Sequence, residues 1–126
     1  MRRVLLIGLL ASAVSLLAAS PAAAKASGFV AHPGNGAPSI TAASGVYFTI
    51  AGGAGGNRDF QQIEVDCSVS GTVVYGTVIA VTFDASGNAT SQTIYPPASS
   101  CTAMQEKPMQ IGKPHILATI TFDVAP

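Results

Sequence analysis

Apolar and polar side chains alternate with a period of two along much of the chain beyond residue 44. In the clearest stretch, residues 63–69, one side of the alternation consists of Ile63, Val65, Cys67 and Val69. Successive side chains of a strand point to opposite faces, so this pattern predicts a strand with one buried face. Residues 45–51 and 116–124 alternate in the same way and are predicted to form half-buried strands.

Residues 72–83 are apolar on both alternating sides, which predicts a central strand, or one whose second face meets a neighbour, with a bulge or bend at Gly76. Residues 84–88 have the composition of a hairpin connection, with Gly87 free to adopt a positive φ angle. The segment 89–95 is then expected to form the returning strand. Residues 98–114 contain Pro108 and Pro114 and are predicted to form a loop.

The first 24 residues have the pattern of a secretory signal peptide. Arg2 and Arg3 precede an apolar run over residues 4–19, and small residues around Ala24 predict the cleavage site. The run is short for a bilayer span, which needs about 20 residues, although a retained membrane anchor is the alternative. The sequence therefore predicts a bacterial protein that is secreted, surface-located or periplasmic, with no membrane span after cleavage.

Composition sharpens the fold prediction once residues 1–24 are set aside. Residues 25–126 contain nine Val, eight Ile and ten Thr but a single leucine, Leu117. Residues that branch at Cβ pack well on a pleated sheet and lose rotamer freedom in a helix. We predict an all-β fold, a small antiparallel β-sandwich or Greek-key barrel over residues 45–126, preceded by an irregular N-terminal arm over residues 25–44. Four basic and six acidic side chains argue against a nucleic-acid partner.

Cys67 and Cys101 are the two cysteines of the chain, separated by 34 positions. Export would place them in an oxidising compartment, where such a pair forms a disulfide. A reactive thiol pair or a pair of metal ligands is the alternative. Because the spacing is not Cys-x-x-Cys and no histidine lies nearby, the sequence favours a structural disulfide.

Few residues indicate catalysis or ligand binding. Glu64 and Asp66 share one strand face and would suit acid–base cleavage of a glycoside or, together with Asn57 and Asp59, calcium binding. A solvated polar face is the simpler interpretation, because the chain has no tryptophan to stack on a sugar. His32 and His115 are far apart in the sequence, which is a poor arrangement for a metal. We therefore predict a protein that is not an enzyme and has no metal or cofactor.

The run Val65–Thr72 around Cys67, the hairpin that follows, and the second cysteine after Ser99 and Ser100 form a recognisable order. This order resembles bacterial secreted β-sandwich subunits of surface fibres and biofilm matrix, and in particular the small exported proteins known as activators of alkane oxidation. The stretch 118–124 resembles the final strand of chaperone–usher pilins more distantly. Pilins usually have their first cysteine nearer the mature N-terminus, and the penultimate tyrosine common in them is absent here.

The resemblance implies an exported structural or adhesive subunit of the surface or matrix. Such a subunit would assemble with itself or with another surface protein through strand edges, with the arm at residues 25–39 as the donated segment. The alternative is a secreted or periplasmic binding or inhibitor module that contacts its partner through loops 52–58 and 98–114. In either case the predicted partner-contact residues are Met104, Met109 and Tyr95.

Overall fold

The computed structural model describes residues 28–52, 60–109 and 111–126. The strands in these residues are β1 (Phe29–Pro33), β2 (Val46–Ile50), β3 (Gln61–Val69), β4 (Thr72–Val81), β5 (Ala89–Thr90), β6 (Ser99–Lys107) and β7 (His115–Val124). This part of the chain has no α-helix, so the all-β prediction is confirmed. The predicted signal peptide, and residues 53–58 of the loop predicted at 52–58, lie outside the described residues.

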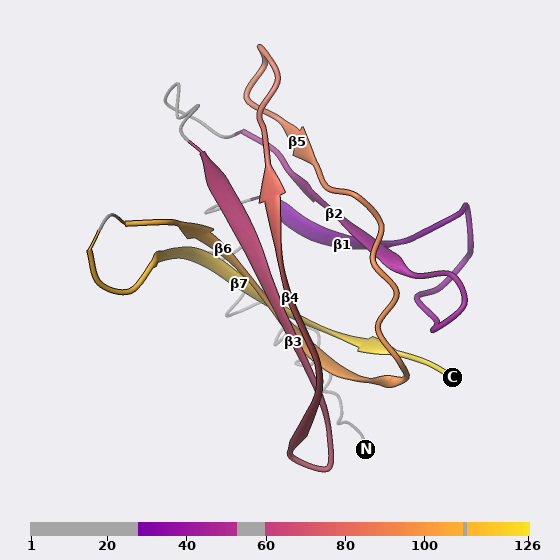
Figure 1. Ribbon diagram of the computed structural model, residues 1–126. Helices are drawn as coiled ribbons and strands as arrows, with labels where there is room; N and C mark the ends of the chain where they lie inside the picture. Colours follow the sequence, from indigo (N-terminus) through magenta and orange to yellow (C-terminus); the bar gives the residue numbers. More distant parts are fainter. Residues whose placement is uncertain (1–27, 53–59, 110) are drawn as a thin grey trace, which may run out of the picture.

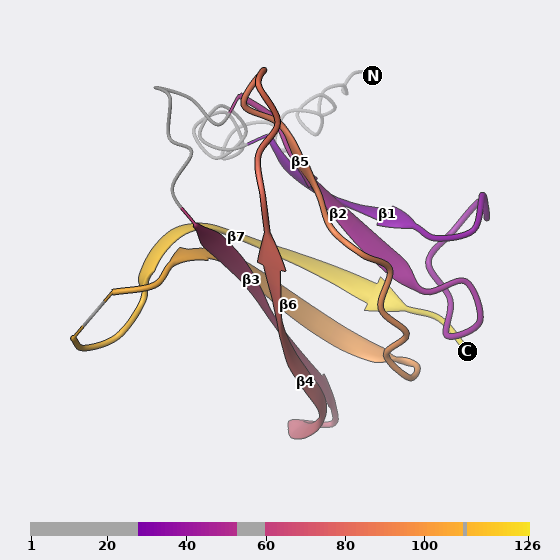
Figure 2. The same ribbon diagram turned by 45° about the horizontal axis from the view of Figure 1, so that its top comes forward.

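The strands form two antiparallel sheets that face each other, one with the order β1-β2-β5 and one with the order β4-β3-β6-β7. Figures 1 and 2 show the two layers, with the turn between β6 and β7 projecting away from the three-stranded sheet. The sandwich prediction is confirmed, and the sheets do not close into the barrel that was its alternative.

The core lies between the two layers and is centred on Phe48 of β2, which has no exposed surface. Its ring lies 5.8 Å from that of Phe29 in the same sheet and 5.7 Å from that of Phe122 in the opposite sheet, measured between centroids. Edge-on and tilted ring pairs of this kind contribute beyond the area they bury. Phe48 therefore joins the two sheets.

The predicted turn at residues 84–88 is present, but the strand after it differs from the prediction. Asp84 accepts hydrogen bonds at Oδ1 from the backbone N–H groups of Ser86 and Asn88, at 2.8 and 3.0 Å. The chain then crosses to the other sheet, where β5 pairs with β2. The predicted strand over residues 89–95 shortens to two residues. Beyond it, the backbone hydrogen bond from Ser91 to Phe48 and an isolated bridge between Ile94 and Val46 continue the contact with β2.

The prediction of a loop over residues 98–114 is wrong for most of its length. Residues 99–107 form β6, which lies between β3 and β7 and pairs with both. The positions that β6 buries on the core side include Ala103 and Gln105, which are small or polar. A buried strand with such residues lacks the apolar alternation by which strands are recognised, so the sequence pattern concealed it.

The predicted N-terminal arm is built into the sandwich over its described part, residues 28–44. β1 pairs along its whole length with β2, and Phe29 belongs to the core. Farther on, the backbone of Ala42 donates a hydrogen bond of 2.9 Å to the carbonyl oxygen of Ala125, just beyond β7. This segment already has its partners within the chain, which argues against its donation to a neighbour.

Gly45, which precedes β2, has a φ angle of +74°. A Cβ atom added there would lie 2.7 Å from the carbonyl oxygen of Ile94, closer than such atoms can approach. We expect Gly45→Ala to lower the free energy of unfolding by at least about 1 kcal/mol in urea denaturation. Gly36→Ala is the matched control, because Gly36 has a φ angle of +71° and no heavy atom within 4 Å of the added Cβ. Equal decreases in the free energy of unfolding for the two variants would show that the contact with the carbonyl oxygen of Ile94 is not the cause.

Candidate functional site

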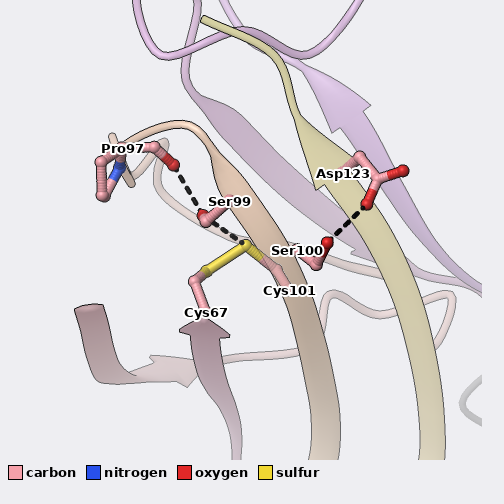
Figure 3. The surroundings of a disulfide bond; sticks show 6 residues. All are labelled: Cys67, Pro97, Ser99, Ser100, Cys101 and Asp123. Atoms are coloured by element: carbon pink, nitrogen blue, oxygen red, sulfur yellow. Dashed lines mark hydrogen bonds between the residues drawn. A yellow bond between two sulfur atoms is a disulfide. The ribbon is translucent and has the colours of Figure 1, made fainter. Parts of the chain in front are cut away.

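Cys67 and Cys101 form a disulfide, as predicted. They are directly opposite each other on β3 and β6, with their Cα atoms 4.0 Å apart, and both are buried on the core face. Figure 3 shows Ser99 beside the bond, donating a hydrogen bond of 2.7 Å to the carbonyl oxygen of Pro97. The disulfide therefore joins adjacent strands of one sheet and leaves the contact between the two sheets to side-chain packing.

The opposite face of the same sheet carries the carboxyl groups. Glu64 and Asp66 project from β3 on this face, in agreement with the prediction that they share a polar face. β6 adds Glu106, which lies opposite Gln62 in the strand register. Glu106 was not among the predicted site residues, because it lies in the segment that was predicted to be a loop. The available signal was the spacing of Thr102, Met104 and Glu106, which places them on one face of a strand.

Glu64 is hydrogen-bonded through its carboxyl group to the carboxyl groups of both Glu106 and Asp66. The hydrogen bond to Glu106 is the main cause that raises the pKa of Glu64 to about 7, followed by burial and then by Asp66. Two carboxyl groups can hydrogen-bond to each other only when one of them holds a proton. The arrangement can therefore take up and release a proton near neutral pH.

The described residues contain no group of three or more His, Cys, Asp or Glu side chains placed to hold a metal ion. His32 stacks on Tyr47 at 4.9 Å between ring centroids, and its Nε2 atom lies 2.7 Å from Oγ1 of Thr49. His115 is exposed at the start of β7. The two histidines thus occupy different sheets.

The three predicted partner-contact residues do not form one surface. Met104 is half-buried on the outer face of β6, and Met109 is exposed in the turn between β6 and β7. Tyr95 is exposed in the connection between β5 and β6, where its hydroxyl accepts a hydrogen bond of 3.2 Å from the side-chain amide of Asn35. The turn and the connection lie on opposite sides of the molecule in both views (Figures 1 and 2).

Sheet edges are the other feature through which a sandwich can bind, because an edge strand has unpaired backbone groups. Two of the edges among the described strands are short, and a third, β7, is protected toward its C-terminal end. β5 has two residues, β1 is short and ends at Pro33, and β7 carries Asp123 and is followed by the backbone pairing of Ala125 with residues 40–42. These are the features that limit pairing between molecules.

β4 is the fourth edge, so the prediction of a central strand over residues 72–83 is wrong: among the described strands, β4 pairs with β3 alone. It lacks these protections along most of its length. It has ten residues, none of them charged and none proline. The register between β4 and β3 shifts near the start of β4, opposite Cys67 and Ser68 of β3. It is regular over residues 75–81 of β4. Val78 is exposed in the middle of this regular stretch. β4 is therefore the least protected edge of the described strands.

The register also shows which residues of β4 direct their backbone groups outward. The short Cα distance of Cys67 and Cys101 is that of a narrow pair, whose backbone groups point away from each other. The N–H and C=O groups of Cys67 thus face β4, and those of Tyr75 opposite it face β3. Because the direction of the backbone groups alternates from one residue to the next, those of Gly76, Val78 and Ala80 face solvent.

Comparisons of the chain with protein-family models, curated proteins and solved structures found no match. In the described part of the chain, no helix has the length and apolar character needed to cross a membrane. The disulfide is compatible with an extracellular or periplasmic protein, since disulfides persist in oxidising compartments.

Proposed function

We propose that this protein is an exported structural subunit, without enzymatic activity, that associates with a second copy of itself at the cell surface or in the surrounding matrix. The observation that carries the proposal is the open edge of β4, which is long and uncharged. Unpaired N–H and C=O groups along such an edge are completed by another extended strand. The predicted signal peptide, the disulfide and the resemblance to secreted β-sandwich subunits support export and the structural role.

A second copy fits this edge by antiparallel pairing of its own β4. Gly76, Val78 and Ala80 offer donors and acceptors at alternate positions, and the same set on the second molecule is complementary when the strands run in opposite directions. Pairing centred on Val78 would place the two Val78 side chains next to each other on the outer face. Val78 is 56% exposed in the single chain, so this contact would remove apolar surface from water.

The carboxyl groups of the outer face do not oppose this pairing. Glu64 lies opposite Val78 on β3, so two copies of Glu64 would be three strand spacings apart, about 14 Å. This distance exceeds the Debye length of about 8 Å at physiological ionic strength, and repulsion is therefore largely screened.

The test replaces Val78 by proline, which removes an N–H group that faces solvent and leaves the ladder to β3 complete. We expect Val78→Pro to weaken self-association at least about tenfold, as measured by analytical ultracentrifugation of the exported protein over a range of concentrations. Val78→Thr is the control, because it keeps both the N–H group and the branched shape and should associate much like the original chain. Circular dichroism verifies that each variant is folded.

Two results would overturn the proposal. One is an original chain that stays monomeric at millimolar concentration. The other is a Val78→Pro variant that is folded and associates as strongly as the Val78→Thr control.

The alternative, a binding or inhibitor module, is favoured by one observation at the turn between β6 and β7. Met109 and Ile111 in the turn and Ile116 at the start of β7 are all exposed, and Ile111 is 89% exposed. This turn is most of the part of the predicted contact loop 98–114 that is not strand. If Ile111→Ser abolishes self-association while Val78→Pro leaves it intact, the turn and not the β4 edge is the contact surface.

A further inference from the structure

The outer face of the four-stranded sheet carries a pair of carboxyl groups that bridges its two central strands. In the register of β3 and β6, Gln62 lies opposite Glu106 and Glu64 lies opposite Met104. Glu64 and Glu106 are therefore diagonal neighbours on one face, within reach of each other. Their carboxyl groups are in hydrogen-bond contact, which requires one of the two to be protonated.

A neighbouring amide also binds the pair. Nε2 of Gln62 donates a hydrogen bond of 2.8 Å to Oε1 of Glu106. Glu106 is 2% exposed, so its carboxylate depends on protein donors in place of water. Glu106 therefore accepts from Gln62 at Oε1, and the proton is shared between Glu64 and Glu106.

The residues that face the pair from the other strands do not balance its charge. From β4, the positions opposite Gln62, Glu64 and Asp66 are Ala80, Val78 and Gly76. From β7, the positions opposite Glu106, Met104 and Thr102 are Ile116, Thr119 and Thr121. The other acidic groups on this face are Asp66 and, farther along, Asp123.

The basic groups lie at the end of the sheet. Lys107 follows Glu106 and by alternation projects to the opposite face, where it pairs in register with His115. Lys113 is in the turn between β6 and β7. Loss of the shared proton therefore leaves adjacent carboxylates on β3 and β6 with no basic side chain opposite either of them in the register of the described strands.

We propose that Glu64 and Glu106 form a proton-dependent lock on the four-stranded sheet, which ties β3 to β6 when protonated and repels them apart when the proton is lost. The folded chain keeps this proton up to about pH 7, the raised pKa of Glu64, whereas in the unfolded chain the carboxyl ionises near its ordinary pKa of 4.5. The stabilisation is complete below about pH 4.5 and is lost as the pH rises through 7. The pair therefore stabilises the fold more in mildly acidic solution than above pH 7.

The test measures the melting temperature of the exported, oxidised protein from pH 4.5 to 8 by circular dichroism. We expect the melting temperature to fall by about 4–8 °C between pH 5 and pH 8. In Glu64→Gln, the amide still donates to Glu106 but has no proton to lose, so the fall should disappear. Asp123→Asn is the matched control, because it removes a carboxylate that accepts a hydrogen bond from Ser100 on the same face and should retain the fall.

A second measurement keeps the inference testable if Glu64→Gln does not fold. The carboxyl carbon of Glu64 in the isotope-labelled original chain should titrate near pH 7 by nuclear magnetic resonance. A melting temperature that is constant or rises from pH 5 to 8, or a Glu64→Gln variant that keeps the fall, would overturn the inference. The same melting temperatures are also measured from pH 4.5 to 8 in Val78→Pro. A fall that is present there too does not come from a pH-dependent loss of self-association.

Discussion

Replacement of Phe48 by alanine is expected to lower the free energy of unfolding by about 3–5 kcal/mol. Phe48 has no exposed surface and touches Phe29 in its own sheet and Phe122 in the other. Its removal leaves a cavity between two layers that no covalent bond joins across the core. Because domains of this size have a total stability of about 5–15 kcal/mol, the variant should be close to unfolding at room temperature. Urea denaturation followed by circular dichroism measures the loss.

Tyr47→Ala is the matched control for this prediction. Tyr47 precedes Phe48 on β2 but faces away from the core and stacks on His32. Since it is half-exposed, we expect its removal to lower the free energy of unfolding by no more than about 1–1.5 kcal/mol. Comparable decreases in the free energy of unfolding for Phe48→Ala and Tyr47→Ala would contradict a core centred on Phe48.

Replacement of both Cys67 and Cys101 by alanine is expected to lower the free energy of unfolding by roughly 3–4 kcal/mol. In the chain-entropy model, this is the stabilisation gained by closing a loop of 34 residues in the unfolded chain. The backbone ladder between β3 and β6 remains, so the variant should keep its strand content at low temperature. Urea midpoints of the oxidised protein and the double variant measure the difference.

Reduction of the original protein is the control for the disulfide. With a thiol reductant, its urea midpoint should approach that of the double alanine variant. Cys67 and Cys101 are buried, so reduction should follow the rate of unfolding and be slow in native buffer. Rapid reduction without loss of structure, or a double variant as stable as the oxidised protein, would show that the bond contributes little.

The sequence predicted those parts of the fold in which local pattern and burial agree. β2 and β3 alternate strictly, β7 alternates from residue 118 on, and Cys67 lies on the apolar side of β3, so the pattern predicted these strands and the inward direction of the disulfide. β6 was missed because its buried positions include Gln105 and Glu106, and polar residues in a strand interior imitate a loop. Central strands of this kind are defined by neighbours on both sides, which only tertiary structure supplies.

The same limit applies to the candidate sites. The shared face of Glu64 and Asp66 follows from a period of two within one strand, whereas their contact with Glu106 depends on the register between two strands. The turn after β4 was predicted from Asp84 and Gly87, but the local sequence does not determine whether the next strand returns to β4 or crosses to β2. That crossing is what leaves β4 open.

The position of β4 also limits how large an assembly this protein can build. A contact that each molecule makes with the identical strand of its partner is used up once it has formed, and the pair then presents no further copy of that surface. We therefore expect a stoichiometry of two, and a filament would require a second, unlike surface on each subunit. A chain with one such edge among its described strands is suited to joining two subunits and less suited to continuous growth.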